Sequence, residues 1–61
     1  MNDPLYEFKN RLVKVIYIDG KEVFAQKGIL VSFDGSFVKL QTLKKTVLIG
    51  RPFIQKIKEC R

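Results

Sequence analysis

The stretch Gly28-Ile29-Leu30-Val31-Ser32-Phe33-Asp34 decides the fold that this sequence predicts. It is a glycine, an apolar β-type run and an acidic turn residue, and a second apolar segment, residues 37–40, follows at once. A glycine inside a strand pattern usually marks a bulge or a sharp bend. We therefore expect a strand that bends near Gly28 and then turns back, so that a short sheet curls over and buries a core.

The chain has 61 residues, the size of one small domain, so we treat residues 1–61 as a single unit. Domains this small often gain stability from disulfides, metals or self-association. Cys60 is the one cysteine and the sequence has no histidine, which excludes an internal disulfide and argues against a zinc site. Because 46% of the residues are hydrophobic, a core is expected, supplemented by association with copies of the chain.

The charge is strongly asymmetric, with twelve Lys and Arg residues, six Asp and Glu residues and a net charge of +6. This excess on a small domain favours an anionic partner, of which nucleic acid is the commonest soluble one. The alternative is a cationic surface that only keeps the protein soluble. No apolar run reaches the roughly 18 residues of a membrane span, and the N-terminus lacks a secretory pattern. We therefore expect a cytoplasmic protein with no membrane association.

The first segment, residues 3–12, has the pattern of a short amphipathic α-helix. Asp3 is a favoured N-cap, and Pro4 suits the first helical position, where its missing N–H costs nothing. Leu5, Phe8 and Leu12 follow at i, i+3 and i+7 and form one apolar stripe. A helix of about two turns is unstable alone, so it is expected to cover one open end of a sheet.

Five β-rich segments follow, separated by glycine, proline and polar turns. They are residues 12–18, 21–33, 37–42, 46–49 and 53–58. With connections this short, the sequence predicts a mainly β protein: a short N-terminal α-helix and a five-stranded, strongly bent antiparallel small barrel of SH3-like topology. The fourth and fifth segments are short and apolar, and as edge strands they would pair with another copy of the chain.

This order of elements resembles the Sm-like family, which includes the Sm and LSm proteins and bacterial Hfq. The residues that fit the first Sm motif are Gly20, Gly28, Leu30, Phe33 and Asp34, and Val38 and Leu40 continue the next strand. The stretch 48–54 and Ile57 resemble the second motif in its Hfq form, with Arg51 at the position of a basic residue near the pore. The resemblance covers nearly the whole chain and implies a homo-oligomeric ring that binds single-stranded RNA.

The sequence departs from the family at two places in the binding motifs. Members from eukaryotes and archaea carry a base-holding asparagine soon after the motif's aspartate, where this chain has Ser36, Phe37 and Val38. The Tyr-Lys-His of Hfq appears as Gly50-Arg51-Pro52, without an aromatic residue or a histidine. The resemblance therefore implies the fold more directly than it implies the pocket in which the family binds a uridine base.

Five residues are candidates for the RNA-binding site. Asp34 could orient a base-contacting loop, or serve only as a turn residue that bonds its own backbone. Phe37 could stack on a base, or belong to the core. Arg51 could hold a phosphate or a base, or be a solvated loop residue. Lys44 and Lys45, at a turn, could contact phosphates or be surface charge only.

Catalysis has no support, because no Ser/His/Asp set, phosphate-binding loop or ligand cluster is present. We therefore expect no enzyme activity, no cofactor, no metal and no small-molecule substrate. The leading function is binding of single-stranded RNA by a homo-oligomer. The alternative is a protein-interaction or structural module that uses the same edge strands without nucleic acid. Binding of double-stranded DNA ranks lower, since the pattern offers no recognition helix.

Overall fold

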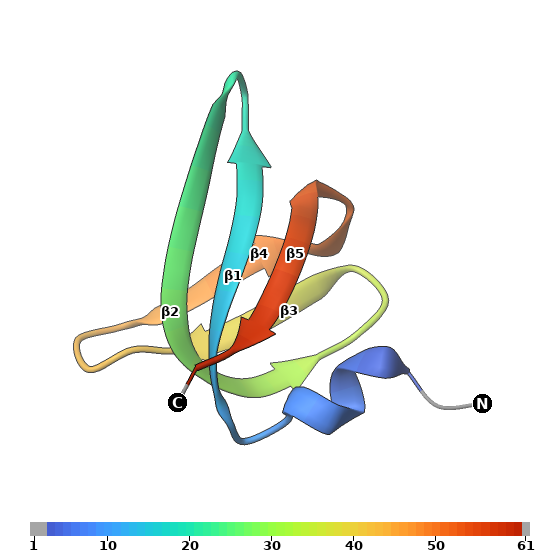
Figure 1. Ribbon diagram of the computed structural model, residues 1–61, viewed down its shortest axis with the longest axis vertical. Coiled ribbons are helices and arrows are strands. Elements are labelled where there is room, and N and C mark those ends of the chain that lie inside the picture. The colour runs from blue at the N-terminus through green and yellow to red at the C-terminus, as the bar shows by residue number, and fades with distance from the viewer. Residues whose placement is uncertain (1–2, 61) are drawn as a thin grey trace.

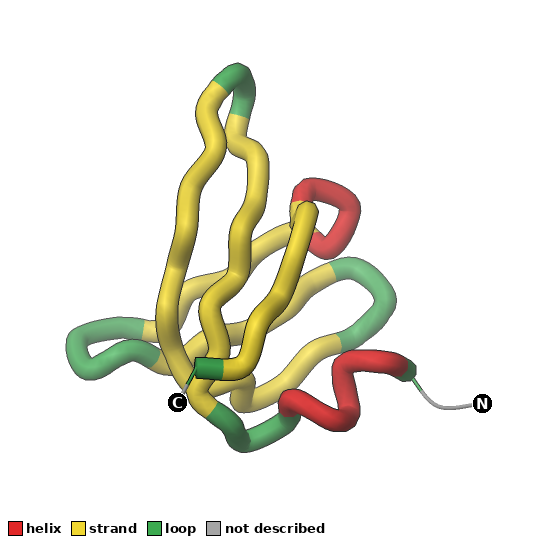
Figure 2. Tube along the Cα trace, in the orientation of Figure 1, coloured by secondary structure: helices red, strands yellow, loops and turns green. Residues whose placement is uncertain are grey.

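The structure is a computed structural model, and it describes residues 3–60. It is mainly β, with five antiparallel strands in one sheet of order β4-β3-β2-β1-β5 (Figure 1). The strands are β1 (Leu12–Asp19), β2 (Glu22–Phe33), β3 (Phe37–Gln41), β4 (Thr46–Gly50) and β5 (Ile54–Glu59). Two short 3-10 helices, η1 (Pro4–Phe8) and η2 (Arg51–Phe53), complete the described chain (Figure 2).

The long strand β2 changes partner at Ile29, about two thirds of the way along its length. It pairs with β1 from Glu22 to Ile29 and with β3 from Ile29 to Phe33. The register with β3 shifts between Leu30 and Ser32, which marks an irregularity of the bulge type. Figure 1 shows β2 curving at this level, so that β3 and β4 cross behind the β1–β2 hairpin. The expected bend of this strand therefore coincides with the transfer from one neighbour to the other.

Gly28 lies at a close approach between β2 and β3. A Cβ placed on Gly28 would lie 3.0 Å from the carbonyl oxygen of Gln41 and 3.3 Å from the Cβ of Leu40. The Gln41 oxygen is a backbone atom and the Leu40 Cβ is bonded directly to the backbone, so neither can move away by a side-chain rotation. Glycine is required here for the close approach of two strands, not for a left-handed backbone conformation.

The core consists of seven buried hydrophobic residues contributed by η1 and by four strands. They are Leu5, Val13, Val15, Leu30, Val38, Leu40 and Ile49. In β1 and β3 the buried residues alternate with exposed ones, because successive side chains of a strand point to opposite faces. The concave face of the bent sheet therefore holds the core, and η1 covers it through Leu5.

The predicted N-terminal α-helix over residues 3–12 is wrong, because the structure has a five-residue 3-10 helix there. Its start agrees with the prediction, since the Asp3 carboxylate accepts a hydrogen bond from the Leu5 N–H at 3.0 Å. Its end is earlier because Asn10 has a left-handed backbone (φ 65°) and donates its N–H to the carbonyl of Leu30 at 2.7 Å. These tertiary bonds to β2 replace helical ones, and Leu12 belongs to β1 instead of the helical stripe.

The turns agree with the predicted breaks to within one residue. The β1–β2 turn has Gly20 and Lys21 at its centre, one residue later than expected, with Gly20 at φ 66°. A positive φ at the first central position alone is typical of a type II′ turn. Strands β4 and β5 lie at the two ends of the sheet order, as predicted for edge strands. Within residues 3–60, no helix combines the length and apolar character needed to cross a bilayer.

Candidate nucleic-acid interface

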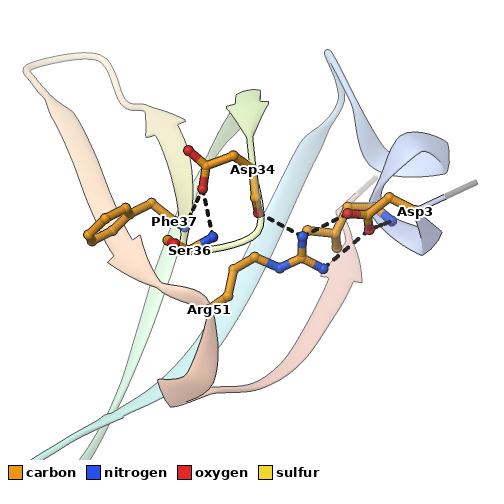
Figure 3. Close-up of polar contacts among 6 residues, drawn as sticks. Asp3, Asp34, Ser36, Phe37 and Arg51 are labelled. Atoms are coloured by element: carbon orange, nitrogen blue, oxygen red, sulfur yellow. Dashed lines mark hydrogen bonds and ion pairs between the residues drawn. The ribbon is translucent and has the colours of Figure 1, made fainter.

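The β2–β3 turn is organised by the carboxylate of Asp34. Its Oδ1 accepts hydrogen bonds from the backbone N–H of Ser36 at 2.7 Å and of Phe37 at 2.8 Å (Figure 3). The Asp34 N–H in turn donates to the Phe37 carbonyl at 2.9 Å. This is the local turn chemistry considered for Asp34 in the sequence. It also fixes the backbone that carries the Phe37 ring, so the carboxylate positions the aromatic residue.

Arg51 ties three segments of the chain together. Its guanidinium donates to both carboxylate oxygens of Asp3, at 2.7 and 3.2 Å, and also to the carbonyl of Asp34 at 2.8 Å (Figure 3). The Arg51 N–H donates to the Ser36 carbonyl at 2.9 Å. Both side chains of the ion pair are about a quarter exposed, at 26% for Arg51 and 27% for Asp3. Arg51 therefore holds the N-terminal segment against the same turn that carries Phe37.

These contacts shift the ionisation of all three groups toward the charged form. The hydrogen bond from Arg51, followed by the one from the Leu5 N–H, lowers the pKa of Asp3 below its ordinary value of 3.8. The N–H groups of Ser36 and Phe37 lower the pKa of Asp34. The bond to Asp3 raises the pKa of Arg51. The cluster is therefore fully ionised at neutral pH, and its positive and negative groups neutralise one another in part.

Phe37 is half-exposed, with 51% of its surface accessible, so it is not a core residue. Its ring points away from the Arg51 guanidinium (Figure 3). It lines a groove of about 420 Å³ on the outer side of β3 and β4. The lining residues are Ser32, Phe33, Asp34, Phe37, Lys39 and Leu48. The groove combines an accessible aromatic ring with one lysine, the two kinds of group that hold an unpaired base and its phosphate.

Lys39 and Tyr6 belong to this area although they were not among the candidate residues. Lys39 lies two positions after Phe37 in β3, and both are exposed, so they share the outer face. The alternation of residues 37–41 could have placed Lys39 there from the sequence. Tyr6 packs edge-to-face on Phe33, with 5.1 Å between ring centroids, and is itself 60% exposed. That contact comes from the position of η1, which the sequence did not provide.

Lys44 and Lys45 lie in the β3–β4 turn, and both are exposed. The Thr42 hydroxyl stabilises this turn by accepting from the Lys45 N–H at 3.0 Å and donating to the Lys45 carbonyl at 2.9 Å. The two lysines line an open groove of about 710 Å³ beside β2, together with Lys27 and the fully exposed Leu43. The turn therefore presents two ammonium groups next to an aliphatic surface.

The five candidate residues fall into two separate groups. Asp34, Phe37 and Arg51 lie at one end of the β3–β4 hairpin, where Phe37 pairs with Gly50. Lys44 and Lys45 lie beyond the other end, where Gln41 pairs with Thr46. Along β3 the two ends are four residue steps apart, a distance of about 13 Å at about 3.3 Å per residue. A ligand that contacted both groups would have to run along the hairpin.

Among the described residues, no group of three or more His, Cys, Asp or Glu side chains is placed to hold a metal ion. Comparison of the chain with protein-family models, with curated proteins and with solved structures finds no significant match. The resemblance to the Sm-like family therefore stays a prediction that rests on the residues quoted for it.

Proposed function

We propose that this protein binds single-stranded RNA through its basic and aromatic outer surface, as a homo-oligomer joined at the edge strands β4 and β5. The observation that carries the proposal is the half-exposed ring of Phe37 in a groove that also contains Lys39. The net charge of +6 supports an anionic ligand. The Sm-like small-barrel topology and assembly into a ring are part of this proposal, as is a role without catalysis in the cytoplasm.

The proposed contacts divide by chemistry. Phe37 stacks on a base, and Lys39, Lys44 and Lys45 contact phosphates, which fix position without reading sequence. Asp34 and Arg51 act mainly as positioning residues, because the Asp34 carboxylate holds the Phe37 N–H and Arg51 is bonded to Asp3 and to the turn.

The test is RNA affinity, measured by fluorescence anisotropy with a labelled single-stranded oligoribonucleotide over a salt series. Affinity should fall steeply with salt, because each neutralised phosphate releases counterions. Phe37→Leu should weaken binding by roughly 5- to 150-fold, the equivalent of about 1–3 kcal/mol for one stacked base. The matched control is Phe24→Leu, which removes a 39% exposed ring from the β1–β2 hairpin and should leave affinity unchanged. Absence of binding at low salt would refute the proposal.

One observation favours the alternative of a protein-interaction module without nucleic acid. Arg51 and Asp34 are already engaged within the chain, and β4 ends the sheet with Leu48 61% exposed. An edge strand with an apolar side chain can add a partner's strand to its own sheet. Affinity purification with and without nuclease separates the two functions, since a partner that remains after nuclease treatment supports this one.

A further inference from the structure

The strand register places three lysines side by side on one face of the sheet. Lys14 of β1 is directly opposite Lys27 of β2 and directly opposite Lys58 of β5. We call Lys58, Lys14 and Lys27 the lysine row. Neighbouring strands lie about 4.8 Å apart, so the row spans about 10 Å of backbone. Val13 and Val15, which alternate with Lys14, are completely buried, so the row lies on the outer face.

No carboxylate of the described chain neutralises the lysine row. The six acidic residues are Asp3, Glu7, Asp19, Glu22, Asp34 and Glu59. Asp3 and Glu59 form the ion pairs of residues 3–60, with Arg51 and with Arg11 respectively. Asp34 caps the β2–β3 turn, and the other three lie in η1 and at the β1–β2 turn. Glu59 directly follows Lys58, but its carboxylate is paired with Arg11 at 3.2 Å, and the other five acidic residues lie outside the row. All three lysines are exposed.

Such an arrangement is unfavourable for the isolated protein. Like charges directly opposite each other in a sheet are destabilising, and Lys14 has one on each side. The sheet would gain stability from any ligand that brought negative charge to this face. An anion bound at the row would therefore relieve the repulsion between its lysines. Lys9 after η1 and Lys21 in the β1–β2 turn differ from the row, because neither has a lysine opposite it.

The row continues toward the β3–β4 turn. The next pair on the same face is Leu12 and Ile29, and both line the groove that also contains Lys27, Lys44 and Lys45. The basic surface therefore extends from β5 across β1 and β2 to that turn, with an aliphatic strip between the lysines. It shares no residue with the Phe37 groove.

We propose that the lysine row is a phosphate-binding track on which the backbone of single-stranded RNA lies, separate from the Phe37 groove. This inference rests on the proposed function and adds a second RNA-contacting face to it. The track has no aromatic residue, and ammonium groups act as point charges, so it attracts every phosphate equally and reads no base. A second copy of this chain would bring the same lysines, so self-association through this face is unfavourable.

The test compares two double variants with equal loss of charge, Lys14→Gln/Lys27→Gln in the row and Lys9→Gln/Lys21→Gln outside it. For the row variant, the slope of log affinity against log salt concentration should become shallower by roughly 1.4, since each phosphate contact to a single strand contributes about 0.7. The control variant should keep the wild-type slope. Equal slopes for the two variants would refute the phosphate-binding track. The proposed function would still stand if Phe37→Leu weakened RNA binding.

Two further measurements complete the experiment. In RNA-free protein, the row variant should have a higher Tm than the control variant, because it removes directly opposed charges. Equal Tm values for the two variants would contradict the repulsion between opposed lysines on which the inference depends. Poly-glutamate of the same charge as the RNA should compete more weakly than RNA itself. If it bound as tightly as RNA or more tightly, the row would not be specific for a phosphate backbone and the proposal would be wrong. Wild-type protein that bound no RNA would refute both proposals.

Discussion

At the scale of single residues, Arg51 is the one whose role the sequence left most open. The residues next to an arginine in a loop do not indicate whether its guanidinium is solvated or paired with a distant carboxylate. Its partner Asp3 is 48 positions away, and the two meet only in the folded chain, where Tyr6 of η1 packs on Phe33 at the end of β2. The bidentate bond to Asp3 and the bond to the Asp34 carbonyl make Arg51 a link between three chain segments. Bidentate pairing of this kind requires the planar guanidinium, so lysine would not replace it.

Acid should weaken this cluster. Asp3 and Asp34 have folded-state pKa values below 3.8, so they bind protons less readily than in the unfolded chain. Their stabilising contribution is complete above the unfolded pKa and is lost as pH falls through the folded values. Thermal unfolding followed by circular dichroism should therefore show a Tm that is constant near neutrality and falls below about pH 4.

The double variant Asp3→Asn/Asp34→Asn should have a lower Tm at neutral pH and a smaller fall in acid. Its control, Asp19→Asn/Glu22→Gln, changes two carboxylates at the β1–β2 turn and should keep the wild-type acid dependence. An identical acid dependence in both variants would show that the Asp3 and Asp34 contacts do not stabilise the fold.

At the scale of elements, β2 is the strand on which the architecture depends. It pairs with β1 as far as Ile29 and with β3 from Ile29 onward. Gly28 allows this change because its missing side chain leaves room for the β3 backbone at Gln41. The same change of partner places Lys27 next to Lys14 on one side and next to the β3–β4 turn on the other.

Gly28→Ala should destabilise the protein by roughly 1–3 kcal/mol, because the added methyl group would have to displace strand backbone. Gly35→Ala is the matched control. Nothing lies within 4 Å of a Cβ at Gly35, so its effect should stay within about 0.5 kcal/mol. Urea unfolding monitored by tyrosine fluorescence measures both. Equal stability of the two variants would show that β2 and β3 can separate at Gly28 without cost.

At the scale of the whole molecule, a seven-residue core and two edge strands make association the expected source of further stability. Partners that bind only the folded state raise the apparent stability with concentration. The Tm should therefore rise as protein concentration is increased, and native mass spectrometry should detect more than one copy. A monomer mass with a Tm independent of concentration would contradict association and would weaken the proposed ring.

The sequence by itself determined the mainly β character, the five strands to within one residue at every boundary, and the bend near Gly28. These features depend on local properties: the alternation of apolar residues, and glycine, proline and aspartate at turns. The sequence also identified Asp34 as a turn residue, which the bonds to Ser36 and Phe37 agree with.

Only the tertiary structure decided the extent of the first helix, the partner of Arg51, the exposure of Phe37 and the alignment of Lys14, Lys27 and Lys58. Each depends on contacts between segments far apart in the chain. The α-helical pattern of residues 3–12 gave way because Asn10 and Arg11 bond to the backbone of Leu30. Lysines 13 and 44 positions from Lys14 become its direct neighbours only when the register of three strands is fixed. The β1–β2 turn sets the Lys14–Lys27 pair, and that turn lies one residue later than the sequence predicted. The Lys14–Lys58 pair depends on the pairing of two strands that are far apart in the chain.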